Sequence, residues 1–192
     1  MTRPAEEASE QGMRRRLLQL LTERSFERRP VVLASGKASD FYIDCKQTTL
    51  HPEGLSLAAA LLVDEILKHP AKISAVAGPT LGADPIVAAI AVNGFSRGLD
   101  FPAIIVRKES KGHGTGQYLE GVLHLEKSRK VAMFEDVVTT GGSMLKAVQH
   151  VRDGGFEVVA CLALVDRLEG GREAIEAAGL PFTTLFTRAD FP

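Results

Sequence analysis

The chain has 192 residues, of which 45% are hydrophobic, so one domain with a sizeable core is expected over residues 1–192. Its 23 basic residues are balanced by 24 acidic ones, which leaves no overall field to attract nucleic acid or an anionic membrane. The longest uninterrupted apolar run has eight residues, far fewer than the roughly 20 that span a bilayer. We therefore expect a cytoplasmic protein with no nucleic-acid or membrane partner.

The first part of the chain predicts a tail, two helices and two short strands. Residues 1–12 are polar and are expected to form a disordered tail. Apolar residues then recur at helical spacing in two stretches, with strands near 31–33 and 41–44 between them. The helical positions are Met13, Leu17, Leu20 and Leu21 in the first stretch, and Leu55, Ala58, Ala59, Leu62 and Ile66 in the second.

From Ile73 onward, strand and helix patterns alternate. The expected strands are 73–77, 103–106, 131–134, 158–165 and 182–186, and the expected helices follow Pro85, follow Ser143 and occupy about 171–178. Such alternation implies parallel strands joined by crossover helices. The sequence thus predicts an α/β fold, with a central mostly parallel sheet flanked by helices and a ligand site at the carboxyl ends of the strands.

The segment VAMFEDVVTTGGS, residues 131–143, gives the strongest indication of chemistry. An apolar strand, typical of a covered position in a parallel sheet, leads to the adjacent acids Glu135 and Asp136 and then to the small residues 139–143. Glycine lets backbone N–H groups close around an anion, and the following helix would present its N-terminus to the same anion. A ribose 5-phosphate explains both the acidic pair and the glycine turn, because its hydroxyls donate to carboxylates while its phosphate reaches the turn.

Alternative roles for this turn fit the surrounding residues less well. In isolation, TTGGS would be an ordinary connection between a strand and a helix. A P-loop is excluded because no Gly-Lys-Ser/Thr follows the glycines, and a dinucleotide fingerprint is excluded because GxGxxG is absent. The apolar strand and the two acids in front of the turn favour the sugar-phosphate site.

A second charged segment, RKESKGHGTG, occupies residues 107–116. Its cations and histidine could neutralise a diphosphate, and its glycines at 112, 114 and 116 would make it mobile, as a lid must be. The alternative is a solvated hairpin loop without a role. The presence of both motifs favours the lid, because residues 131–143 would hold the ribose phosphate and residues 107–116 the leaving pyrophosphate.

Together with LASGKASDFYIDCK at residues 33–46, these segments resemble the orotate phosphoribosyltransferases of the type I phosphoribosyltransferase superfamily, in the order and approximate spacing of that family. The resemblance runs from about Leu33 to Arg167. It implies a type I phosphoribosyltransferase-like fold with a small N-terminal hood region. It also implies transfer of the 5-phosphoribosyl group from phosphoribosyl pyrophosphate (PRPP) to orotate, which gives orotidine 5-phosphate and pyrophosphate in de novo pyrimidine synthesis.

The resemblance further implies Mg²⁺, carried mainly by PRPP or pyrophosphate, and a homodimer whose lid residues are shared between subunits. No protein metal site is expected, since no cluster of ligands has the right spacing. Lys111 and His113 would be catalytic, while Thr139 and Arg167 would contact orotate. The residues expected to bind PRPP are Arg107, Lys108, Lys111, His113, Glu135, Asp136, Val137, Val138, Thr139, Thr140, Gly141, Gly142 and Ser143.

An arginine suits the orotate site because its planar fork matches the carboxylate that distinguishes orotate from uracil. Without the resemblance, Arg167 would be taken for a surface residue after a strand. Two cations common in the family are absent, since this chain has Ala34 and Gly82 where many relatives carry lysine. Lys37 could replace part of this charge, and Gly82 could offer a backbone N–H.

The remaining histidines and the cysteines are expected to have no part in the chemistry. Cys45 and Cys161 are predicted to be buried free thiols, because they lie far apart without ligand spacing. The histidines predicted to be structural or solvent-facing are His51, His69, His124 and His150.

Two other functions remain open. A salvage phosphoribosyltransferase for a purine or uracil would keep the 131–143 motif without needing Arg167 or the 107–116 segment. A regulator that reuses the fold to bind RNA or DNA would be expected to show a basic face, which the balanced charge does not favour.

Overall fold

The computed structural model describes residues 9–32, 38–111 and 117–192. Its centre is a six-stranded sheet with the strand order β5-β4-β3-β6-β7-β8. All neighbouring strands pair in parallel except β4 and β5, which are antiparallel, so the prediction of a mostly parallel sheet is confirmed. The strands are β3 (Ala75–Pro79), β4 (Ala103–Lys111), β5 (Gln117–Glu120), β6 (Lys130–Val138), β7 (Glu157–Asp166) and β8 (Phe182–Thr187).

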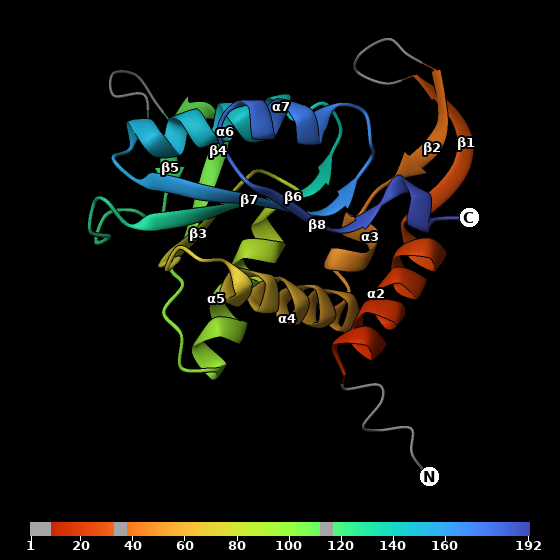
Figure 1. Cartoon of the computed structure of the whole chain (residues 1–192), viewed down its shortest axis with the longest axis horizontal. Helices are drawn as coiled ribbons and strands as arrows, with labels where there is room; N and C mark the ends of the chain where they lie inside the picture. Colours follow the sequence, from red (N-terminus) through yellow and green to blue (C-terminus); the bar gives the residue numbers. More distant parts are fainter. Residues whose placement is uncertain (1–8, 33–37, 112–116) are drawn as a thin grey trace.

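Helices cover both faces of this sheet (Figure 1). On one face lie α4 (Pro52–Lys68) and α5 (Asp84–Ser96), and on the other lie α6 (Gly142–Asp153) and α7 (Gly171–Ala177). Each face has its own apolar core, and successive residues of β6 point into opposite cores, with Phe134 on the α4 and α5 side and Met133 on the α6 side. This double covering explains why β6 and β7 are apolar at successive positions.

The N-terminal elements lie at one end of the molecule and form the expected hood. They are α2 (Glu10–Arg24), β1 (Phe26–Val32), β2 (Ala38–Ile43) and the short α3 (Lys46–Thr49). Strands β1 and β2 pair antiparallel in a sheet of their own, separate from the central one. Three aromatic rings, those of Phe26, Phe41 and Phe191, join this end to the C-terminus, with centroids 5.1 to 5.5 Å apart.

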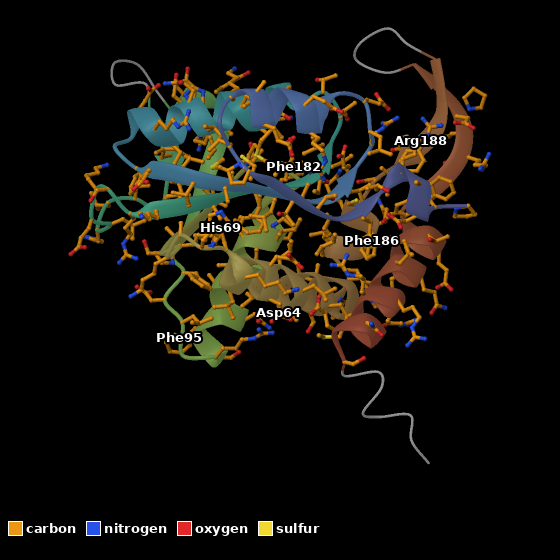
Figure 2. All side chains as sticks on the ribbon, viewed as in Figure 1. Asp64, His69, Phe95, Phe182, Phe186 and Arg188 are labelled. Carbon is orange, nitrogen blue, oxygen red and sulfur yellow. The ribbon has the colours of Figure 1, made fainter. Side chains whose placement is uncertain are left out.

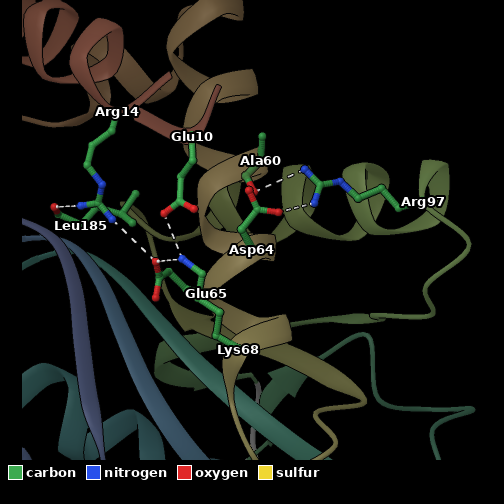
Figure 3. A network of polar contacts seen from close by, with 8 residues as sticks. All are labelled: Glu10, Arg14, Ala60, Asp64, Glu65, Lys68, Arg97 and Leu185. Carbon is green, nitrogen blue, oxygen red and sulfur yellow. Dashed lines mark hydrogen bonds and ion pairs between the residues drawn. The ribbon is translucent and has the colours of Figure 1, made fainter. Parts of the chain in front are cut away.

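Charged side chains connect α2 and α5 to α4 (Figure 3). The Lys68 ammonium contacts Glu10 at 2.9 Å and Glu65 at 3.1 Å, while Arg97 contacts Asp64 at 2.6 Å. Arg14 donates to the carbonyl oxygen of Leu185 in β8. Because most of these ion pairs are partly solvated, each contributes roughly 0 to 1 kcal/mol, and the apolar cores hold the layers together.

Several element boundaries differ from the sequence prediction. Helix α2 begins at Glu10, inside the predicted tail, because the Ser9 side chain accepts a hydrogen bond from the Gly12 N–H at 3.1 Å and caps the helix. Residues 1–8 lie outside the described part of the chain. Strand β1 starts at residue 26 rather than 31, and both α3 and β5 are additional elements. Both are only four residues long, too short for a periodic pattern to be recognised.

Two longer differences concern the functional motifs. Strand β4 continues to Lys111, so residues 107–111 extend the strand instead of forming a loop, and β6 continues to Val138. Glu135 and Asp136 therefore lie within a strand rather than after it. No helix in the described residues is both long and apolar enough to cross a membrane.

Candidate active site

The 131–143 motif forms a strand, a tight turn and a helix N-terminus. The turn needs glycine at Gly141, whose φ of +79° lies in the left-handed region. A Cβ atom there would also lie 3.1 Å from the carbonyl oxygen of Gly171 at the start of α7. At Gly142, by contrast, a Cβ would meet only Thr140 Oγ1 at 3.9 Å. The start of α6 is thus open to solvent on one side, as an anion site at a helix N-terminus requires.

The acidic pair is largely buried beside this helix start. Ser143 Oγ donates a hydrogen bond to Glu135 Oε1 at 2.5 Å, whereas Glu135 Oε2 is buried and has no hydrogen-bond partner among the described residues. Burial raises the pKa of Glu135 to about 7, with the Asp136 charge adding to the rise and Ser143 and Lys108 opposing it. Glu135 therefore offers an unfilled acceptor next to the turn.

Asp136 is held by the main chain and by a cation. Its Oδ1 atom accepts a hydrogen bond from the Val137 N–H at 3.0 Å. Burial raises the pKa of Asp136, while the Lys46 ammonium is the main influence that lowers it. Both acids can thus accept hydrogen bonds from a ligand, with a cation near each.

A pocket of about 510 Å³ opens beside these carboxylates. Its lining includes five of the residues predicted to bind PRPP: Arg107, Lys108, Glu135, Asp136 and Ser143. The other lining residues are Lys46, Pro79, Thr80, Leu81, Gly82, Val106, Lys146, Ala147 and His150. The pocket thus combines the ends of β3, β4 and β6 with α3 and α6, at the carboxyl edge of the sheet where α/β folds bind ligands.

The other predicted PRPP residues lie elsewhere. Residues 137–142 belong to the end of β6, the turn and the first residue of α6, but they do not line this pocket. The backbone of Lys111 pairs with Gln117 across the β4–β5 hairpin. The Lys111 side chain, His113, Ala34 and the expected substitute Lys37 lie outside the described residues.

The two cations at the end of β4 are differently engaged. Arg107 Nη1 contacts Glu120 Oε1 at 3.1 Å, which joins β4 to β5 across the antiparallel hairpin. Lys108 is exposed, and its charge acts on Glu135. A bound diphosphate would therefore have to draw Arg107 away from Glu120, or share it.

Arg167, predicted to contact orotate, follows β7 directly, and its side chain is only 11% exposed. Its backbone N–H bonds to the carbonyl oxygen of Val138 at 2.9 Å, so it lies beside the phosphate turn. The guanidinium contacts Glu169 Oε1 at 3.0 Å and donates to the carbonyl oxygen of Phe41 at 2.9 Å. It therefore joins the sheet to the hood, and it does not line the 510 Å³ pocket.

Three basic pocket residues could not be recognised from the sequence pattern. Lys46 lies at the end of the 33–46 stretch, where nothing in the pattern marks it as a ligand-binding residue. Lys146 and His150 lie three and seven residues after Ser143, and this helical spacing places them on one face. His150, predicted to be structural or solvent-facing, stacks on Tyr118 with ring centroids 3.8 Å apart and also lines the pocket. Its buried Nε2 atom has no hydrogen-bond partner among the described residues.

Comparisons with known proteins show which family the chain resembles. A model of the phosphoribosyl transferase domain matches residues 46–178. The orotate phosphoribosyltransferase of Sorangium cellulosum is 52% identical over 178 residues, which cover 93% of this chain and 92% of that protein. The crystal structure of Mycobacterium tuberculosis orotate phosphoribosyltransferase with Fe(III) dicitrate has a TM-score of 0.79 at 37% identity, covering 93% of this chain and 98% of that one. The same enzyme in complex with PRPP has a TM-score of 0.75 at 36% identity, with the same coverage.

The mostly parallel sheet, the acidic pair followed by a glycine turn, and the match to the phosphoribosyl transferase domain define the class of protein, a type I phosphoribosyltransferase. Within this class the identities over nine-tenths of the chain are decisive. The chain belongs to the orotate phosphoribosyltransferase family.

Proposed function

We propose that the pocket beside Glu135 and Asp136 transfers the 5-phosphoribosyl group of PRPP to N1 of orotate, forming orotidine 5-phosphate and pyrophosphate in pyrimidine synthesis. The observation that carries this assignment is the buried acidic pair, which lines one cavity together with several cations and leads along the chain to an open glycine turn at the start of α6. The acids would accept the ribose hydroxyls, and the N–H groups of residues 139–143 would bind the 5-phosphate.

The chemical step resembles other glycosyl transfers. As the bond from the ribose carbon to pyrophosphate breaks, positive charge develops on the sugar in an oxocarbenium-like state. Arg107, Lys108 and Lys111 would stabilise the departing negative charge together with His113, and closure of the 107–116 segment would exclude water. Arg167 and Thr139 would position orotate so that its nitrogen faces the ribose carbon.

Mg²⁺ is proposed to arrive on the diphosphate. Among the described residues, no group of three His, Cys, Asp or Glu side chains is placed to hold a metal. Magnesium usually keeps several waters and binds one or two carboxylates with substrate phosphates, and the unpartnered Oε2 of Glu135 next to Asp136 fits such a role. When bound, the ion would neutralise part of the diphosphate charge.

A homodimer with shared lid residues is also proposed. Helix α5 presents Val92 and Phe95, which are 73% and 82% exposed, on one face, and Figure 2 places Phe95 at the edge of the molecule. Leu81 on the pocket lining is 65% exposed. Exposed apolar side chains of this size suit contact with a second copy. Both cysteines are free and buried, which agrees with a cytoplasmic, reducing environment.

The deciding experiment is an assay of PRPP consumption with orotate, uracil or adenine as the acceptor, in the presence of Mg²⁺. We expect turnover with orotate and little with the other two bases. Preferred turnover with adenine or uracil would instead indicate a salvage enzyme, the nearest alternative. A gel-shift test at physiological salt checks the nucleic-acid regulator, for which no binding is expected.

A further inference from the structure

Lys46 lines the pocket and has no role in the reaction proposed above. It begins the short helix α3, whose neighbouring residues Cys45, Thr48 and Thr49 are fully buried. Thr48 Oγ1 lies 2.7 Å from Ser25 Oγ and 3.2 Å from the carbonyl oxygen of Leu20. These contacts fix the backbone of α3, so that the ammonium of Lys46 is brought to the pocket wall by a rigid support.

The Lys46 side chain lies among carboxylates. Its Nζ atom contacts Asp44 Oδ1 at 2.5 Å, and the side chain remains 36% exposed. The hydrogen bond with Asp44, and the charges of Asp44 and Asp136, raise the pKa of Lys46 despite some desolvation. The ammonium is therefore charged at neutral pH and can still be reached by a ligand.

The 79–82 turn of the pocket wall supplies no cation near Asp136. The turn at residues 79–82 carries no charged side chain, and its Thr80–Leu81 peptide bond is cis. A Cβ atom on Gly82 would lie 2.3 Å from Oδ1 and 2.4 Å from Oδ2 of Asp136. The carboxylate thus packs against the backbone of Gly82 and excludes any side chain there.

The other lining cations are occupied differently. Arg107 is paired with Glu120, and Lys108 acts on Glu135 from the end of β4. Lys146 belongs to α6 and lies three residues after Ser143 in the sequence. Of the described lining cations, Lys46 is the one whose charge has the largest effect on Asp136. Lys46 would therefore offset the repulsion between Asp136 and a diphosphate bound next to it.

We infer that Lys46 binds the diphosphate of PRPP and the pyrophosphate product, and so supplies from the hood the cation that the 79–82 turn cannot carry. This inference rests on the proposed function. On binding, the ammonium moves its hydrogen bond from Asp44 to a phosphate oxygen, which a flexible point charge with three donors can do without moving α3.

Calorimetric titration of pyrophosphate with Mg²⁺ into Lys46→Ala, Lys46→Arg and Asp44→Asn variants tests this role. Lys46→Ala should weaken pyrophosphate binding about tenfold to a hundredfold, the usual range for a charge-assisted hydrogen bond. The same variant should raise KM for PRPP and leave KM for orotate nearly unchanged, while Lys46→Arg recovers part of the affinity. Lys68→Ala is the matched control, because Lys68 also contacts carboxylates but lies on α4 outside the pocket.

Asp44→Asn separates ligand binding from a structural ion pair. It removes the carboxylate partner and keeps the ammonium, so pyrophosphate affinity should stay the same or improve. Equal losses in Asp44→Asn and Lys46→Ala would overturn the inference, and so would an unchanged affinity in Lys46→Ala.

If Lys46→Ala lost its near-ultraviolet circular dichroism, Lys46→Gln would be titrated in its place. A wild-type protein that turns over PRPP with orotate while Lys46→Ala binds normally contradicts only the role of Lys46. A wild-type protein that neither binds pyrophosphate nor consumes PRPP contradicts the proposed function as well.

Discussion

Glu135 combines a buried carboxylate with one hydrogen bond from the described residues, donated by Ser143. Its pKa is raised by burial to about 7, so the folded protein holds this proton more tightly than the unfolded chain does. By linkage, the free energy of unfolding falls as the pH rises from 4.5, the ordinary pKa of this side chain, to about 7, its pKa in the folded protein. At higher pH the full destabilisation remains. The residue therefore destabilises the free protein at the pH where its charge would serve the ligand.

Glu135→Gln should consequently stabilise the free protein and weaken PRPP binding. The gain should be small at pH 5 and reach at most about 3 kcal/mol at pH 8, because glutamine keeps an acceptor for Ser143 without a charge to bury. Denaturant unfolding at both pH values measures the gain, and titration with PRPP measures the loss. Glu157→Gln, on an exposed residue at the start of β7, is the control. A pH-independent difference between Glu135→Gln and wild type would contradict the raised pKa.

Arg167 has two roles to separate, since it holds Glu169 and Phe41 in the free protein and is proposed to bind orotate. Arg167→Ala should raise KM for orotate about tenfold to a hundredfold, leave KM for PRPP nearly unchanged and reduce the preference for orotate over uracil. Its Tm should also fall, because the link to the hood is lost. Glu169→Gln removes the ion pair but keeps the guanidinium, so orotate binding should persist. Equal weakening of both substrates by Arg167→Ala would show a structural role alone.

Among the elements, the long periodic ones could be predicted and the short ones could not. The strand-helix alternation after Ile73 is confirmed, and it is clearest at β3, β6 and β7, which are covered on both faces and therefore have apolar runs. The four-residue α3 has no period of its own, and its position depends on the buried hydroxyl of Thr48, a tertiary contact. This is why the acidic pair could be found from sequence, whereas the pocket role of Lys46 could not.

The turn between β6 and α6 gives a prediction at this scale. Gly141→Ala should destabilise the protein by about 1 to 2 kcal/mol through its left-handed conformation alone, with a further cost from the contact with Gly171. Gly98→Ala is the control, because Gly98 has a φ of +75° and a Cβ there would meet nothing within 4 Å. Denaturant midpoints of both variants isolate the contact, and PRPP titration reports the distorted turn. Equal stability losses and unchanged PRPP binding would show that the turn tolerates a side chain.

At the scale of the whole molecule, the pocket depends on segments that are distant in the sequence. The hood supplies Lys46, the β3–α5 turn supplies Gly82, and the β6–α6 motif supplies the acidic pair. The hood is attached to the rest of the molecule through the contacts of Phe26 and Phe41 with Phe191 near the C-terminus, and through the donation from Arg167 to the carbonyl oxygen of Phe41. Movement of the hood would therefore change the diphosphate and orotate contacts together. The 107–116 segment is the proposed lid of the pocket. Its proposed action in the neighbouring subunit's site can be tested without a structure of the dimer.

Mixing two inactive variants tests that action. Lys111→Ala removes the proposed lid cation, and Asp136→Asn removes one of the two carboxylates proposed to hold the ribose, so each homodimer should be nearly inactive. If the lid acts in the neighbouring subunit, a mixed dimer has one site with both lesions and one site with neither. Random exchange of equal amounts should then restore about a quarter of wild-type activity, since half of the dimers are mixed and each has one intact site. Mass measurement of the mixed species confirms exchange. Exchange without recovered activity would place Lys111 in the site of its own subunit, and a monomeric mass for both variants would contradict the dimer itself.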